Sequence, residues 1–90
     1  MKIKELYSDA SKWTQGTFYK DKSGNKVNSK EDGVSFCLIG AVDYCYVLHI
    51  EWFEIYNKIA NKVGCPPTVY NDDKCRTFEE VKALVEELDI

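Results

Sequence analysis

Four residues of this chain have side chains of the kinds that bind zinc: Cys45, His49, Cys65 and Cys75. Residues four apart share one side of a helix, so Cys45 and His49 could point the same way, and Cys65 and Cys75 lie in or beside a later loop. Structural zinc sites usually contain two cysteines separated by two to four residues, and no such pair occurs here. Buried thiols are therefore the leading interpretation, and a Cys3His zinc site is the alternative.

A second chemistry would use Cys37 or Cys45 as a nucleophile with His49, the only histidine, as its base. Both cysteines lie in the most apolar stretch of the chain, where burial raises the pKa of a thiol and makes it inert. Phosphate-binding loops, the dinucleotide-binding glycine pattern and metalloprotease motifs do not occur. We expect no catalytic residue and no cofactor, with a thiol enzyme as the weakest alternative.

Asn71, Asp72 and Asp73 carry the oxygen ligands that hard cations prefer, but the regular acidic spacing of a calcium loop is not matched. Short Asn and Asp side chains also accept hydrogen bonds from their own backbone in tight turns. We interpret these residues as a turn that leads into the last helix.

The charge of the chain is unevenly distributed. Residues 1–30 contain seven lysines and three acidic residues, whereas residues 31–90 contain five basic and twelve acidic residues, and the net charge is −3. Trp13, Phe18 and Tyr19 among the lysines could stack on bases, but a pI of about 5.1 is opposite to that of a typical nucleic-acid-binding domain. We expect a protein partner rather than a nucleic acid.

A length of 90 residues predicts a single domain, residues 1–90, with one hydrophobic core. The longest nearly uncharged run, residues 33–50, contains Asp43 and His49 and falls short of a membrane span. Residues 1–6 are charged and lack the apolar core of a signal peptide. We therefore expect a cytoplasmic location with reduced thiols.

Apolar residues recur at helical spacing in four segments, which predicts helices over residues 2–12, 36–47, 50–63 and 78–88. Gly64 ends the third helix, and Thr77 with Glu80 forms a capping box at the start of the last. Residues 68–76 are predicted to form a loop. A turn at 23–25 predicts a short β-hairpin between the first and second helices. The expected fold is mainly α, a compact bundle of about four helices.

Gly40 lies inside the second predicted helix, where glycine costs about 1 kcal/mol relative to alanine. Such a residue indicates a close approach by another backbone or a large ring. We expect Trp13 to be that neighbour.

Four short motifs follow one another along the chain: Trp13-x-x-Gly16, Cys37-x-x-Gly40-Ala41, Asn71-Asp72 and Thr77-x-x-Glu80-Val81. In this order they resemble a family of small bacterial and phage proteins classed as a domain of unknown function, over nearly the whole chain. The resemblance implies a compact helical fold held together by these anchors, and it supplies no catalytic residues. Small phage proteins often block host complexes, so it also implies an inhibitor of a host complex such as bacterial immune machinery.

The leading interpretation is thus a small intracellular protein-interaction module. Exposed tyrosines often anchor such contacts, and we expect Tyr19, Tyr46 and Tyr70, together with Asp73, to contact the partner. The sequence does not specify an oligomeric state.

Overall fold

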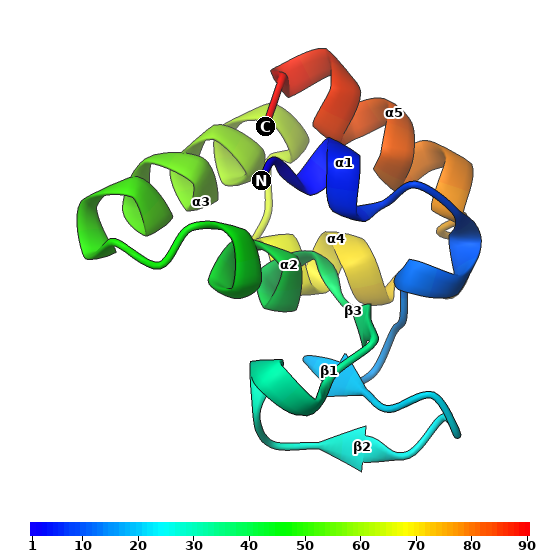
Figure 1. Cartoon of the computed structure of the whole chain (residues 1–90). Coiled ribbons are helices and arrows are strands. Elements are labelled where there is room, and N and C mark those ends of the chain that lie inside the picture. The colour runs from blue at the N-terminus through cyan, green and yellow to red at the C-terminus, as the bar shows by residue number, and fades with distance from the viewer.

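The computed structural model describes residues 1–90 and combines five α-helices with a small antiparallel sheet (Figure 1). The fold is mainly α, as predicted, with one more helix than expected. The helices are α1 (Ile3–Leu6), α2 (Leu38–Cys45), α3 (His49–Val63), α4 (Pro67–Asp72) and α5 (Phe78–Leu88). The strands are β1 (Tyr19–Lys20), β2 (Lys26–Val27) and β3 (Ser35–Phe36).

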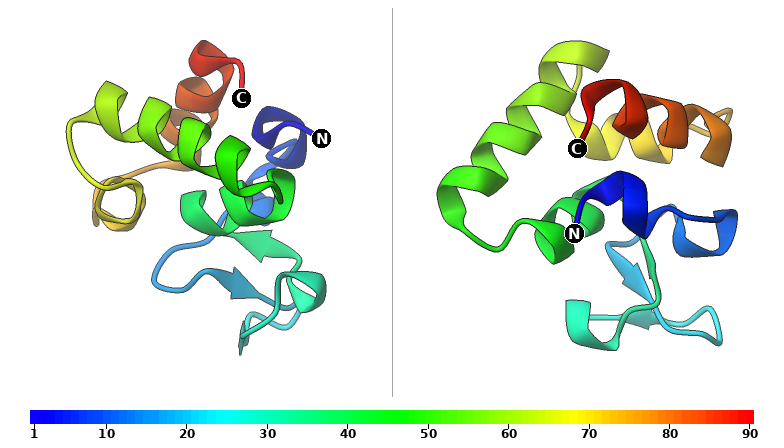
Figure 2. Two further views of the ribbon diagram at one scale, coloured as in Figure 1. Left: turned by 90° about the vertical axis from the view of Figure 1, so that its left-hand side faces the viewer. Right: turned by 45° about the horizontal axis from the view of Figure 1, so that its top comes forward.

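The helices gather on one side of the molecule and the sheet projects from the other, below α2 and α4 in Figure 1. Both views in Figure 2 place the two ends of the chain near each other. The contact is direct, because the backbone N–H of Lys4 donates to the carbonyl oxygen of Ile90 at 3.2 Å, and the Ile90 side chain is buried. No helix is long and apolar enough to cross a bilayer.

One hydrophobic core joins all of these elements except α4 and β2, and partly buried side chains of those two pack against it. The last helix supplies the most regular face, since Val81, Leu84 and Val85 follow helical spacing and are all buried. The buried core residues are Ile3, Leu6, Tyr7, Tyr19, Phe36, Leu38, Ala41, Val42, Ile55, Ile59, Val81, Leu84, Val85 and Ile90.

The predicted helix over residues 2–12 is wrong beyond its first turn. α1 ends at Leu6, and a separate 3-10 turn covers Ala10–Lys12. The Asp9 side chain begins that turn by accepting a hydrogen bond from the Ser11 backbone at 2.9 Å. The Asp9 side chain thus starts a new turn, and Ala10, within the predicted helix, is exposed.

The predicted hairpin is part of a larger unit than expected. β1 pairs with β2 on one edge and with β3 on the other, so the strand order is β2-β1-β3, antiparallel throughout. Because Tyr19 pairs with Phe36, the second predicted helix starts two residues late, at Leu38, and ends at Cys45. The sheet therefore attaches directly to the N-terminus of α2.

The predicted loop over residues 68–76 is wrong in its first half, where α4 lies. Proline is compatible with the first turn of a helix because the backbone N–H it lacks would have no partner there. Pro67 occupies that position, so the Pro66-Pro67 pair starts α4 as well as following α3.

The ends of the two long helices match the prediction. Gly64 ends α3 in the left-handed conformation with φ of 77°. At the start of α5 the Thr77 hydroxyl accepts from the Glu80 backbone at 3.2 Å, and the Glu80 carboxylate accepts from the Thr77 backbone at 2.9 Å. Both signals are local, which is why the sequence alone reveals them.

Candidate functional site

Asn71 joins three separate segments of the chain through four hydrogen bonds of its fully buried side chain. Its Oδ1 accepts from Trp13 Nε1 at 2.7 Å and from the backbone N–H of Leu38 at 3.0 Å. Its Nδ2 donates to the Thr14 carbonyl at 3.1 Å and to Asp72 Oδ1 at 2.9 Å. The two lone pairs of the amide oxygen and both of its N–H donors are used, so this residue is an internal connector.

The segment around Gly16 is bound to the end of α4 by further hydrogen bonds. The Gly16 backbone donates to Asp72 Oδ1 at 3.1 Å, and Gln15 Nε2 donates to the carbonyls of Asn71 at 2.8 Å and Asp73 at 3.0 Å. The structure thus brings together Trp13, Gly16, Asn71 and Asp72, which the motifs placed more than fifty residues apart. The Asp73 side chain is exposed beside them.

Cys37, Gly40 and Ala41 form the start of α2 and are buried. Cys37 is the N-cap, and its Sγ accepts from the Gly40 backbone at 3.3 Å. A Cβ on Gly40 would collide with the backbone carbonyl of Phe18, whose carbon would lie only 3.1 Å away. The expected close approach at Gly40 is therefore present, but Trp13 as its partner is wrong.

The three tyrosines expected on the surface are covered to different degrees. Tyr19 is buried in the core and its hydroxyl donates to Asp43, so its expected exposure is wrong. Burial and that hydrogen bond raise the pKa of Tyr19. Tyr46 is half-buried, and Tyr70 is half-buried with the Arg76 guanidinium 3.6 Å above its ring centroid. The face of the Tyr70 ring that Arg76 covers is therefore not free to contact a partner.

The zinc-binding alternative has no geometric basis in this structure. No three His, Cys, Asp or Glu side chains are placed to hold one metal ion, so Cys45, His49, Cys65 and Cys75 are not brought together. Burial raises the pKa of the Cys45 thiol to about 11 and also raises that of Cys37. Neither thiol has the depressed pKa that activates a nucleophile.

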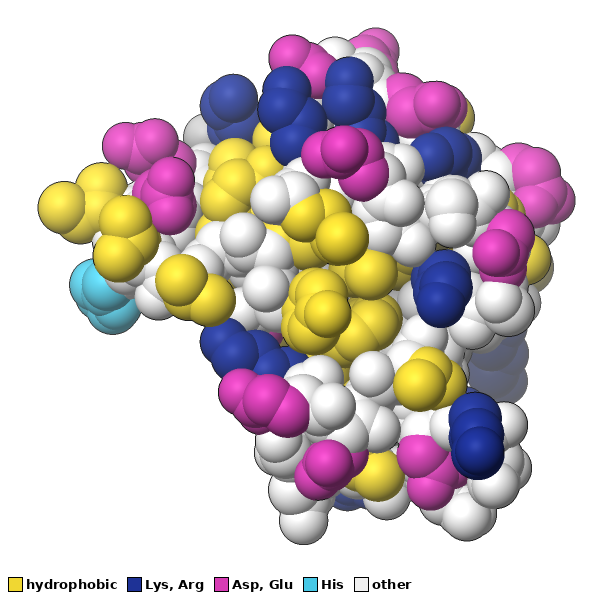
Figure 3. Space-filling model, viewed as in Figure 1, with side chains coloured by type: hydrophobic (Ala, Val, Ile, Leu, Met, Phe, Trp, Pro, Cys, Tyr) yellow, Lys and Arg dark blue, Asp and Glu magenta, His cyan; other side chains and the backbone are white.

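Large apolar side chains are exposed where α2 passes into α3. We name this the α3-tip surface and define it as Val47, Leu48, Ile50 and Phe53, whose exposed fractions are 69%, 63%, 73% and 48%. Hydrophobic side chains project over the start of α3 at the left-hand edge of Figure 3, beside acidic ones. Such groups are normally scattered singly, whereas these four fall within seven residues.

The fold explains why these residues stay exposed. Within α3 only Ile55 and Ile59 are buried, and both lie beyond its first turn. The first turn extends past the core, on the side away from α5 in Figure 1. This surface was not predicted from the sequence, because Phe53 falls in the apolar stripe of the predicted helix over residues 50–63 and Val47 in the apolar segment of residues 36–47. The sequence contains one signal for this surface. Val47 and Leu48 are adjacent apolar residues that do not follow the helical spacing of either neighbouring helix.

A pocket of about 290 Å³ lies beside the α3-tip surface. The Tyr19 hydroxyl donates to Oδ2 of Asp43, which lines this pocket. Trp52 forms part of the wall and stacks on Tyr56 with ring centroids 5.2 Å apart. The lining residues are Lys30, Asp43, Tyr46, Val47, His49 and Trp52.

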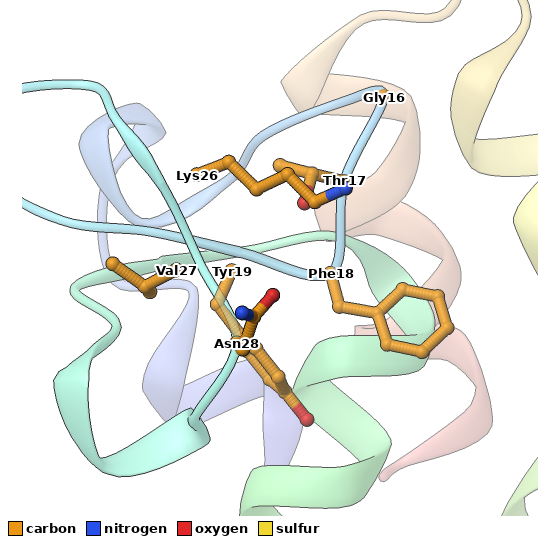
Figure 4. Close-up of a pocket in the computed structure, with 7 residues that line it drawn as sticks. All are labelled: Gly16, Thr17, Phe18, Tyr19, Lys26, Val27 and Asn28. Carbon is orange, nitrogen blue, oxygen red and sulfur yellow. The ribbon is translucent and has the colours of Figure 1, made fainter.

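A second pocket, of about 310 Å³, lies at the sheet, between the chain before β1 and the chain around β2. Figure 4 shows the Lys26 side chain extending toward Thr17, whereas the Phe18 ring points away from Lys26. Lys26 and Tyr19 are its only titratable residues, and the Tyr19 hydroxyl is already bound to Asp43. This arrangement contains no pair of an acid and a base.

The most distinctive surface feature is therefore apolar rather than catalytic. Comparisons of this chain with protein-family models, with curated proteins and with solved structures found no match.

Proposed function

We propose that this chain is a small protein-interaction module that docks on its partner through the α3-tip surface. The observation that carries the proposal is the exposure of Val47, Leu48, Ile50 and Phe53 at one end of the molecule. Burying a large apolar side chain is worth about 1.5 to 3 kcal/mol, so a partner that covers several of them gains substantial affinity.

The form of the surface supports binding to a groove. Ile50 and Phe53 are three residues apart in α3, so they project from neighbouring positions on one side of the helix. Phe53 is held in place by edge-to-face contacts with His49 and Trp52, at centroid distances of 5.0 and 5.7 Å. A helix that presents preordered apolar side chains fits the mode in which a helix lies in a hydrophobic groove.

The motif resemblance extends this proposal to a biological role. We propose that the module acts in the cytoplasm of a bacterial or phage-infected cell, where it inhibits a host complex such as bacterial immune machinery. The anchor residues would then serve the fold, because Trp13, Gly40 and Asn71 make internal contacts. Binding would depend on the α3-tip surface.

Capture from a lysate of the source cell tests this function. The Ile50→Lys variant is expected to retain the fold, because Ile50 is 73% exposed, and to capture at least tenfold less partner than the wild type. A charged ammonium group inside an apolar contact carries a desolvation cost that accounts for this loss.

Val69→Lys is the matched control, since Val69 is 60% exposed on α4, away from the α3-tip surface. It should capture the partner as well as the wild type does, and circular dichroism should show that both variants are folded. Equal capture by Ile50→Lys and the wild type would refute the proposal.

A further inference from the structure

The charges around the α3-tip surface restrict what can cover it. Each helical residue is rotated by about 100°, so Glu51 and Glu54 lie on one flank of Ile50, whereas His49 and Trp52 lie on the other. His49 and Trp52 line the pocket that contains Asp43. Carboxylates therefore border the apolar residues on both flanks.

None of these three carboxylates has a cationic partner within the chain. The ion pairs of the structure involve other acidic residues, and Glu51 and Glu54 are exposed. Lys30, the cation at the pocket, donates from its Nζ to the backbone carbonyl oxygen of Asp43 at 3.1 Å rather than to the carboxylate. The acidic groups are thus free to pair with a partner.

The half-buried side chain of Tyr46 also lies in surroundings with negative charge, on the side of the pocket. Burial is the main cause of its raised pKa, and the carboxylates of Glu51 and Asp89 act in the same direction. The aromatic wall that Tyr46 and Trp52 provide also attracts a cation, because the faces of such rings carry negative charge.

Like charges oppose the covering of this surface by a second copy of the chain. If two α3 helices paired antiparallel around a two-fold axis, Glu51 and Glu54 of one copy would lie near the same residues of the other. Such like-charge contacts are unfavourable, and they are most costly where apolar contact excludes water.

We propose that the α3-tip surface binds an apolar protein segment that is flanked by lysine or arginine, with one cationic side chain entering the pocket at Asp43. This inference rests on the proposed function and adds the chemistry of the partner. The apolar residues supply affinity, and the carboxylates supply selectivity and faster association.

Selection from a library of random peptides displayed on particles tests the inference with the folded chain as bait. We expect the selected peptides to combine apolar residues with at least a twofold excess of lysine and arginine over the library. A representative selected peptide is then synthesised, and its affinity is measured for the wild type and for variants.

The double variant Glu51→Lys/Glu54→Lys should bind that peptide at least tenfold more weakly, and Asp43→Asn should bind it more weakly while retaining an acceptor for Tyr19. Glu86→Lys/Glu87→Lys on α5 is the control of equal charge change, and it should bind as the wild type does. Unchanged affinity of Glu51→Lys/Glu54→Lys, or an equal loss of affinity in the control, would contradict the inference.

The two proposals fail in different ways. If Ile50→Lys and the wild type select the same peptides, the α3-tip surface is not the docking site and the proposed function fails. If apolar peptides are selected through Ile50 without an excess of lysine and arginine, docking through the α3-tip surface stands and the basic partner is excluded. A dimer that depends on Ile50 in native mass measurements would also exclude the basic partner, because a second copy would then cover the surface.

Discussion

Replacing Asn71 by alanine is expected to lower the free energy of unfolding by about 3 to 5 kcal/mol, the largest effect of any single change considered. The substitution removes the acceptor shared by Trp13 Nε1 and the Leu38 backbone and the donor to the Thr14 carbonyl. Buried polar groups that lose their partners retain the full cost of desolvation, and a cavity adds to it. Urea unfolding followed by tryptophan fluorescence measures the change.

Asn57→Ala provides the control, because Asn57 is exposed on α3 and makes no side-chain hydrogen bond. It should change stability by no more than about 0.5 kcal/mol. If Asn71→Ala costs less than about 1 kcal/mol, the three segments are not held together by this residue.

Gly40→Ala is expected to lower the free energy of unfolding by about 2 to 4 kcal/mol, although alanine normally stabilises a helix interior by about 1 kcal/mol relative to glycine. The added methyl group would meet the Phe18 carbonyl, which is backbone and already accepts from the Cys37 N–H at 3.1 Å. Relief would require α2 and the start of the sheet to separate.

Ala83→Gly, an exposed change in the interior of α5, gives the ordinary helical cost for comparison. It should destabilise by about 1 kcal/mol. Urea unfolding measures the free energy of unfolding of both variants. A Gly40→Ala protein that is as stable as the wild type, or more stable, would show that the close approach is not tight.

Elements with local signals were predictable from the sequence. α5 has a capping box at Thr77 and a regular apolar period, and α3 ends at a glycine whose positive φ the sequence anticipates. Each of these features depends on residues within one or two turns, so tertiary contacts do not alter them.

Elements that depend on distant partners were not predictable. α1 is limited to four residues, and β3 exists because Phe36 pairs with Tyr19 across the sheet. The polar residues Asn71 and Asp72 looked like turn formers, yet they lie in α4 because their side chains bond to Trp13 and Gly16 instead of to local backbone.

The candidate site shows the same division. The motifs identified residues with special surroundings, and Gly40 met a close neighbour as expected, but the neighbour was the Phe18 backbone. Periodicity cannot tell which part of a wide apolar stripe extends beyond the core. Phe53, which belongs to that stripe, is therefore exposed, whereas Tyr19, which was expected at the surface, is buried.

The most direct test of docking through the α3-tip surface is photo-cross-linking in the source cell. Benzoylphenylalanine at position 53 should form one covalent adduct with a protein partner, and adding Ile50→Lys should abolish it. The same group at position 18 is the control, since Phe18, just before β1, is 50% exposed and Phe53, in α3, is 48% exposed. An absent adduct at 53, or equal adduct with that partner from 18, would contradict the account.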